Sequence, residues 1–174
     1  TAQYNNGATS IKCFGTSGNT GLVGWTLSSS SVSTRVYFRI PSAPGATSDI
    51  MQFRNTGNGG GLQLRTDRKL AVVNDASAAV FTAATACDVD TWYRLEIAMA
   101  KGTDTSTGVI NFAYYLGDST SAIETYSVSN ANCGTDDWTG VRWGKLTGIA
   151  FSLDLYFDDF AASTGTTTLL GPML

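Results

Sequence analysis

The feature that most constrains this chain is a two-residue alternation of apolar and polar side chains, repeated in short runs along its length. In TRVYFRI, Val36, Phe38 and Ile40 share one phase, and polar or amphipathic residues share the other. In WYRLEIAM, the apolar phase includes Leu95 and Ile97. Because successive side chains of a strand point to opposite faces of a sheet, this alternation predicts strands that bury one face in a core.

Clusters of turn-forming residues separate these runs, among them PSAPG, NTGNGGG, KGTDTSTG and NANCGTDD. No window of ten or more residues shows a helical period. About ten to twelve short antiparallel strands at this spacing predict a β-sandwich or barrel. The chain has 174 residues, no internal repeat and no linker-like break. Residues 1–174 are therefore predicted to form one all-β domain with a single core.

Charge and composition exclude several classes of partner. Only 14% of the residues are charged and the net charge is −3, whereas a phosphate backbone requires a basic stripe, so nucleic acid is excluded. No apolar run approaches the ~20 residues that span a bilayer, so we expect no membrane insertion. The uncharged polar surface favours a secreted or particle-displayed protein. The start, TAQYNNGATS, has no signal-peptide pattern, so either a leader has been removed or this is a piece of a longer chain.

The sequence offers little catalytic chemistry. It contains no histidine, so Ser-His-Asp, Cys-His and zinc sites lack their usual groups. Glycosidases need two carboxyl groups roughly 5–10 Å apart, but Glu96 and Glu124 are the only glutamates and stand in different runs. Asp154 and Asp158 share a face of one run, but they would lie roughly 13 Å apart at ~3.3 Å per residue. We therefore expect no catalytic residues and no enzyme activity.

Three cysteines and a pair of aspartates leave alternatives open. Cys87 and Cys133 border strand-like runs and are the candidates for a disulfide, whereas Cys13 alternates within a run like a buried apolar residue. Three buried thiols are the alternative. The apolar phase shifts at Asp158 and Asp159, as a bulge or a strand end would produce. We favour carboxylates that accept backbone N–H groups there, with a calcium site as the competing interpretation.

Sugar recognition needs an aromatic face flanked by carboxylates or amides. In NANCGTDDWTGVRWG, Trp138 follows turn-forming residues and is expected to be exposed, although it could instead cap the sandwich edge. Trp143 alternates with Val141 and is more typical of a packed residue. Trp25 and Trp92 sit in strand patterns and are expected in the core or in contacts between the sheets. The candidate sugar-binding residues are Asn132, Asp136, Asp137, Trp138 and Trp143.

A second candidate surface is basic. Four arginines fall on the polar faces of strands that could be neighbours, where they would form a patch for acidic sugars or a protein partner. A solvated outer sheet explains them as well. The members of this predicted patch are Arg35, Arg39, Arg54 and Arg65, with Tyr37.

The order of the runs resembles a known superfamily. TRVYFRI, LQLRTDRKLAVV, TWYRLEIAM, GVINFAYYL and LDLYFDDFAAS span residues 34–163. Together they are similar to the concanavalin A-like lectin/glucanase superfamily in its laminin-G-like form, as found in bacterial surface proteins and phage tail or capsid-associated proteins. The resemblance implies a jelly-roll sandwich of two curved sheets, whose concave face or loop rim often binds sugars. Hydrolases of the superfamily carry an E-x-D-x-x-E-like run, which this chain lacks.

These observations favour a non-catalytic domain displayed outside the cell or on a virion surface, where carbohydrate recognition for attachment is combined with a structural role. Two alternatives remain. The first is a purely structural decoration or tail domain that packs against neighbouring subunits or copies of itself. The second is a glycoside hydrolase or lyase. An exposed Trp138 would favour sugar binding, and a broad apolar outer patch would favour assembly.

Overall fold

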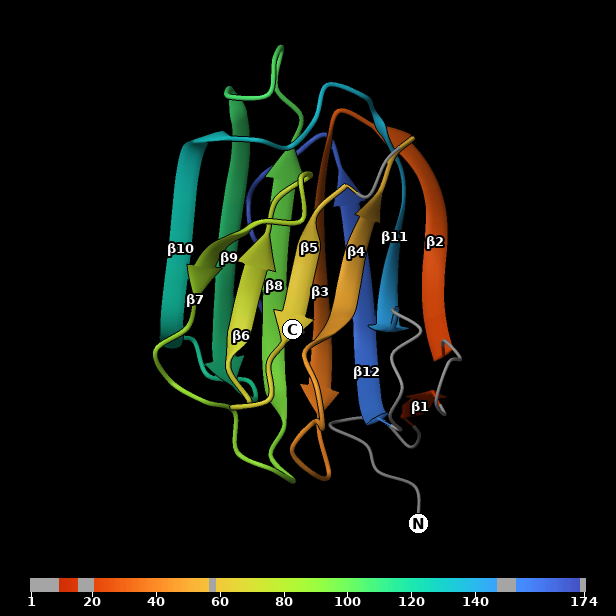
Figure 1. Ribbon diagram of the computed structural model, residues 1–174, viewed down its shortest axis with the longest axis vertical. Helices are drawn as coiled ribbons and strands as arrows, with labels where there is room; N and C mark the ends of the chain where they lie inside the picture. Colours follow the sequence, from red (N-terminus) through yellow and green to blue (C-terminus); the bar gives the residue numbers. More distant parts are fainter. Residues whose placement is uncertain (1–9, 16–20, 57–58, 147–152, 173–174) are drawn as a thin grey trace.

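The chain folds into two antiparallel sheets packed face to face (Figure 1). The computed structural model describes residues 10–15, 21–56, 59–146 and 153–172, and all regular elements within them are strands. They are β1 (Ile11–Gly15), β2 (Gly21–Ser29), β3 (Ser31–Arg39), β4 (Ser48–Arg54), β5 (Gly61–Leu64), β6 (Leu70–Val73), β7 (Ala79–Thr82), β8 (Tyr93–Ala100), β9 (Gly108–Leu116), β10 (Ala122–Ala131), β11 (Trp138–Lys145) and β12 (Leu153–Thr164). The predicted all-β jelly-roll sandwich of ten to twelve strands is confirmed. This described part of the chain contains no helix that could cross a membrane.

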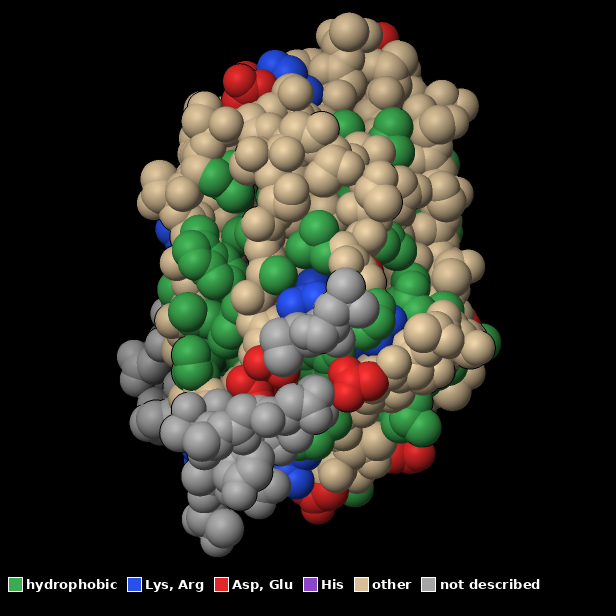
Figure 2. Space-filling model, turned by 180° about the vertical axis from the view of Figure 1, so that it is seen from behind, with side chains coloured by type: hydrophobic (Ala, Val, Ile, Leu, Met, Phe, Trp, Pro, Cys, Tyr) green, Lys and Arg blue, Asp and Glu red, His purple; other side chains and the backbone are tan. Residues whose placement is uncertain are grey.

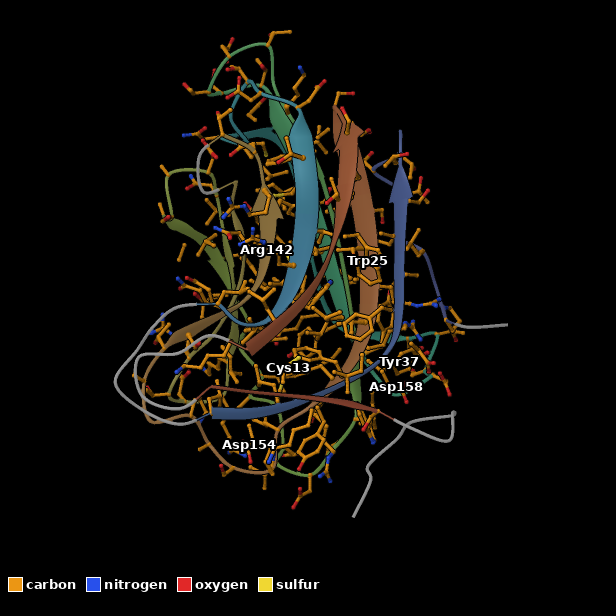
Figure 3. The ribbon with its side chains drawn as sticks, turned by 90° about the vertical axis from the view of Figure 1, so that its right-hand side faces the viewer. Cys13, Trp25, Tyr37, Arg142, Asp154 and Asp158 are labelled. Atoms are coloured by element: carbon orange, nitrogen blue, oxygen red, sulfur yellow. The ribbon has the colours of Figure 1, made fainter. Side chains whose placement is uncertain are left out.

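Each sheet has six strands that are out of sequence order. The back sheet runs β1-β12-β3-β8-β9-β10, and the front sheet, which faces the viewer in Figure 1, runs β2-β11-β4-β5-β6-β7. Segments far apart in the sequence are therefore neighbours, as where β12 pairs with β3 and β11 pairs with both β2 and β4. Figure 3 shows the two layers from the side.

The core between the two sheets is apolar. It is built from the side chains that the alternation predicted to face inward. Val36 and Phe38 of β3 and Leu95 and Ile97 of β8 are all fully buried. From the front sheet, Trp143 enters the core. Burying such side chains stabilises a fold by about 1.5–3 kcal/mol each, so the inner faces provide the main driving force for packing the sheets.

The polar phase of β3 and β8, two central strands of the back sheet, is also buried, which the alternation did not predict. Tyr37, Arg94 and Glu96 are at most 1% exposed. The C-terminal segment, residues 165–172, contacts this face: Gly171 donates its backbone N–H to the Glu96 carboxylate at 2.8 Å, and its carbonyl accepts a hydrogen bond from Arg35 at 2.8 Å. Figure 2 looks onto this face, where charged side chains gather near the centre. The C-terminal segment therefore covers the middle of the outer face of the back sheet.

Arg94 and Glu96 form an ion pair that is closed off from solvent. Arg94 Nε lies 2.7 Å from Glu96 Oε1, and the two side chains are 1% and 0% exposed. Arg94 also donates to the carbonyl of Gly117 at 3.4 Å and of Ser119 at 3.0 Å, and its guanidinium lies 3.9 Å from the ring centroid of Tyr115. Burial acts to lower the pKa of Arg94, but its hydrogen bonds, first that to Glu96, outweigh this and raise it.

The cysteines are buried free thiols, so the predicted Cys87–Cys133 disulfide is wrong. Cys87 follows Thr85 by two residues, and the Thr85 carbonyl accepts a hydrogen bond from Tyr114 near the end of β9. Cys133 instead packs against Gly108 at the start of β9. Gly108 and Tyr114 are six positions apart, which is about 20 Å along a strand. A disulfide needs Cα atoms within about 7 Å.

Candidate functional site

The aromatic side chains of the predicted sugar loop lie inside the sandwich. Trp138 is completely buried, and its ring centroid lies 5.4 Å from that of Phe53. The pairing of β11 with β2 shifts register between Trp138 and Gly140, and Thr139 is exposed. The expectation that Trp138 is exposed is therefore wrong, because a bulge interrupts the two-residue period. Trp143 is fully buried, as its alternation indicated.

The polar members of that loop take part in contacts that hold the end of the sandwich together. The Asp136 carboxylate accepts a hydrogen bond from the hydroxyl of Thr56. Asp137 pairs with Lys101 at 2.8 Å, and the Asn132 side chain accepts a backbone N–H within its own turn. The structure thus brings the three polar candidates to one loop but gives them no exposed tryptophan, so we no longer assign sugar binding to this loop.

Asp158 and Asp159 form the bulge that the phase shift indicated. The pairing of β12 with β3 shifts register between Asp158 and Ala161. The Asp158 carboxylate accepts the backbone N–H of Asp159 at 2.9 Å, and Asp159 has a φ of +51°, a conformation that aspartate tolerates better than most residues. Among the described residues, no group of three or more Asp, Glu, Cys or His side chains is placed to hold a metal ion. The calcium site stays a prediction.

The predicted arginine patch is divided between the two sheets. Arg35 and Arg39 lie in β3 of the back sheet and are buried there, as is Tyr37. Arg54 ends β4 of the front sheet, and Arg65 directly follows β5. One continuous patch is therefore wrong, because the polar phase of a strand does not say which sheet the strand joins.

The front sheet carries a groove on its outer face, across β2, β11 and β4. The hollow has a volume of about 430 Å³. Figure 3 shows Arg142 pointing away from the sandwich on this side. We call this hollow the arginine groove; it is lined by Leu22, Gly24, Trp25, Thr26, Arg54, Thr139, Gly140 and Arg142. Its volume lies in the range of about 300–1,000 Å³ that is typical of ligand sites.

Two glycines leave the floor of the groove without side chains. In the register of the sheet, Gly140 lies between Thr26 of β2 and Arg54 of β4, and Arg142 lies opposite Gly24. A Cβ atom on Gly140 would stand only 2.6 Å from a backbone carbonyl oxygen of β2, and one on Gly24 only 2.7 Å from a carbonyl oxygen of β11. Only glycine fits such a close approach of two backbones, so the strands themselves keep the hollow open.

The groove is electropositive. Arg54 and Arg142 form no ion pair within the part of the chain that the structure describes, and no acidic residue lines the groove. Each of the two side chains presents a guanidinium group with its planar fork of N–H donors to the groove.

A second hollow of about 310 Å³ adjoins the groove and is also lined by both arginines. Its other polar lining residues include Gln52 and Ser77, and Asp49 is its one carboxylate.

Sequence reasoning missed Arg142 and left Trp25 open between a core position and a contact between the sheets. Arg142 alternates with the core residues Val141 and Trp143, a signal that could have placed it on the outer face. Trp25 is 40% exposed on the edge strand β2 of the front sheet, so a core position is wrong, but its ring meets Phe160 of β12 in the back sheet edge-on at 5.5 Å, which confirms the expected contact between the sheets. It lines both the arginine groove and a hollow of about 310 Å³ between β2 and β12. An edge position, which alternation does not reveal, explains this exposure. Half-buried Trp92 precedes β8.

Comparisons with known proteins identify the fold of this chain but assign it to no family. No protein-family model matches the chain, and no curated protein matches its sequence. Solved structures do match. A sialidase superposes with a TM-score of 0.63 at 9% identity over 91% of this chain, and an Aplysia kurodai PL-14 alginate lyase with 0.62 at 10% over 91%. A botulinum neurotoxin type C structure, concerned with cell entry through two ganglioside molecules, superposes with 0.60 at 14% over 93%.

These likenesses are to parts of larger proteins in two of the three cases. The chain spans 16% of the sialidase chain and 41% of the toxin chain, but 84% of the alginate lyase chain. At such low identity the likeness shows a shared β-sandwich fold, and a shared fold does not carry function with it.

Proposed function

We propose that this protein is a non-catalytic carbohydrate-binding domain of the concanavalin A-like, laminin-G-like type, displayed outside the cell or on a virion, where it combines attachment with a structural role. The observation that carries the proposal is the arginine groove. It is an open hollow of ligand size on the outer face of a sheet, with two arginines and two threonine hydroxyls and a floor of backbone. Such convergent polar groups in a concave site are typical of small-ligand recognition.

The proteins of similar fold support this choice of ligand class. They include a structure concerned with ganglioside interaction, a sialidase and an alginate lyase, so the fold serves proteins connected with sugars. We transfer from them the class of ligand alone, because the sequence identities are between 9% and 14%.

The positions of the glutamates favour binding over catalysis. Glu96 is buried against Arg94. The Glu124 carboxylate accepts the backbone N–H groups of Ala84 at 2.9 Å and Thr85 at 2.6 Å. Both of the chain's glutamates thus hold the fold together, and neither lines the groove. A glycosidase site needs two carboxyl groups facing one sugar, so we keep hydrolase or lyase activity as the less favoured alternative.

Assembly is the second candidate function, and one edge of the front sheet favours it. β2 ends the strand order of that sheet and its sequence, GLVGWTLSS, contains no charged residue. Leu22 is 44% exposed and Trp25 40%. An uncharged, partly apolar edge strand can pair with another chain. The oligomeric state, measured by sedimentation with native protein and a Thr26→Lys variant, tests this role; a monomer in both cases contradicts it.

The test of carbohydrate binding is a glycan array probed with three proteins. The native chain is compared with Thr26→Trp, which fills the groove without changing its charge, and with Thr105→Trp, a matched change at an exposed position of the β8–β9 loop. We expect a set of glycans to bind the native protein and Thr105→Trp and to be lost from Thr26→Trp. If no glycan binds the native protein, the proposed function is wrong.

A further inference from the structure

We propose that the arginine groove selects anionic glycans, those carrying carboxylate or sulfate groups, over neutral ones. The inference rests on the proposed carbohydrate-binding function and names the ligand class of the same site.

The first argument is the distribution of arginines in an acidic protein. The chain carries a net charge of −3. Most of its arginines already have a partner within the protein, either an acidic side chain or a backbone carbonyl. Four pair with acids: Arg39 with Asp90, Arg65 with Asp67, Arg68 with Asp88, and Arg94 with Glu96. Arg35 donates to the carbonyl of Gly171. The remaining two arginines, Arg54 and Arg142, have no acidic partner among the described residues, and both line the groove.

The second argument is geometric. Arg54 lies opposite Gly140, and Arg142 follows Gly140 by two residues in the neighbouring strand. Diagonal neighbours of this kind on one face of a sheet are about 7–8 Å apart, within joint reach of long side chains. Two guanidinium forks can therefore meet one ligand. Each fork matches a carboxylate or sulfate group with two parallel hydrogen bonds, which are stronger than hydrogen bonds between neutral groups.

The third argument is that the groove lacks the carboxylate and amide acceptors that usually hold a neutral sugar. Hydroxyl groups donate as well as accept hydrogen bonds, and neutral sugars are commonly held by carboxylates or amides that accept from them. The groove lining contains no carboxylate and no amide side chain. Its donors are the two arginines and the hydroxyl of Thr26, which lies opposite Gly140, whereas the hydroxyl of Thr139 already donates to the carbonyl of Arg54 at 3.3 Å. A ligand that brings its own negative acceptors forms charge-assisted hydrogen bonds with these donors, whereas the hydroxyl oxygens of a neutral sugar accept weaker ones.

The experiment measures equilibrium binding of four probes to the native protein. They are a short oligouronate, a sulfated oligosaccharide of the same length, a neutral oligosaccharide of the same length, and a short DNA duplex as a non-sugar polyanion. The same titrations are made with Arg54→Gln, Arg142→Gln, and the control Arg65→Gln, whose arginine side chain is 43% exposed and lies outside the groove. Thermal melting verifies that each variant is folded, and Arg→Lys replaces any Gln variant that is not.

We expect one or both anionic oligosaccharides to bind and the neutral one to bind at least ten-fold more weakly. Each groove variant should lose about ten- to hundred-fold in affinity, the range for a hydrogen-bonded charged group, and Arg65→Gln should bind like the native protein. Which of the two anionic oligosaccharides binds more tightly separates carboxylate from sulfate as the recognised group.

Three outcomes would overturn the inference, and they are distinguishable. If the neutral oligosaccharide binds as tightly as the anionic ones, carbohydrate binding stands and the anionic selectivity is wrong. If DNA binds as tightly as the oligosaccharides, the groove attracts negative charge without recognising sugar. If no oligosaccharide binds here and no glycan binds on the array, the proposed function fails together with the inference.

Discussion

The buried ion pair on the outer face of the back sheet gives the sharpest test of how this fold is held together. Glu96→Gln keeps the size of the side chain and an oxygen that can accept the N–H of Gly171, but it removes the charge that faces Arg94. Removing one partner of a buried pair costs about 3–5 kcal/mol, because the remaining charge is left in a low dielectric. We therefore expect Glu96→Gln to destabilise the protein strongly.

The structure places the expected loss at the lower end of that range. Arg94 would keep the carbonyls of Gly117 and Ser119 as acceptors, and its guanidinium would still lie over the ring of Tyr115. We expect about 3 kcal/mol, which for a chain of this size lowers the melting temperature by about 6–12 °C. With a urea dependence of about 1–3 kcal/mol per molar, the unfolding midpoint falls by about 1–3 M.

Urea unfolding followed by tryptophan fluorescence measures this loss. The matched control is Asp137→Asn, which breaks the more exposed pair with Lys101 and should cost less than about 1 kcal/mol. The double variant Arg94→Met/Glu96→Gln should recover much of the loss, because no unpaired charge remains. If Glu96→Gln costs no more than Asp137→Asn, the reasoning about the buried pair is refuted.

Three further predictions concern the tryptophans, the thiols and calcium. Trp138→Ala should cost about 3–5 kcal/mol, the range for a buried large aromatic, whereas Trp25→Ala should cost less than half of that because Trp25 is 40% exposed; equal losses in urea unfolding would contradict the assigned burial. Burial raises the pKa of the three cysteines to between about 11 and about 12, so a thiol reagent at pH 8 should label none in the native protein and all three in urea. Unfolded thiols ionise near pH 9 while the buried native thiols keep their protons, so raising the pH favours the unfolded state. The free energy of unfolding is therefore highest below pH 9 and falls as the pH rises towards 11 and 12. Urea midpoints that do not fall over this interval would argue against the raised thiol pKa values. A calcium site at Asp158 and Asp159 predicts a melting temperature that rises with calcium in the native protein and not in Asp158→Asn, and no rise with calcium removes that interpretation.

The strand content and the inner faces could be predicted because they depend on local period. Val36, Phe38, Leu95 and Ile97 occur where strict alternation puts them, and all are in the core. The phase shift at Asp158 also marked a real bulge, because a bulge disturbs the period within a few residues. Each of these features is set by neighbours in the chain, so the sequence alone carries enough information to locate it.

What the sequence determined by itself was therefore the all-β class, the approximate number of strands and the inward-facing residues of the strictly alternating runs. The tertiary structure alone decided the rest. Strand order brings Arg142 of β11 beside Arg54 of β4. The bulge after Trp138 turns that ring inward, and the C-terminal segment covers Glu96. The two-residue alternation indicates which side chains share a face of a strand. Which residues surround that face depends on pairing between distant strands and on distant segments that pack over the sheet. The candidate site is a product of those long-range contacts.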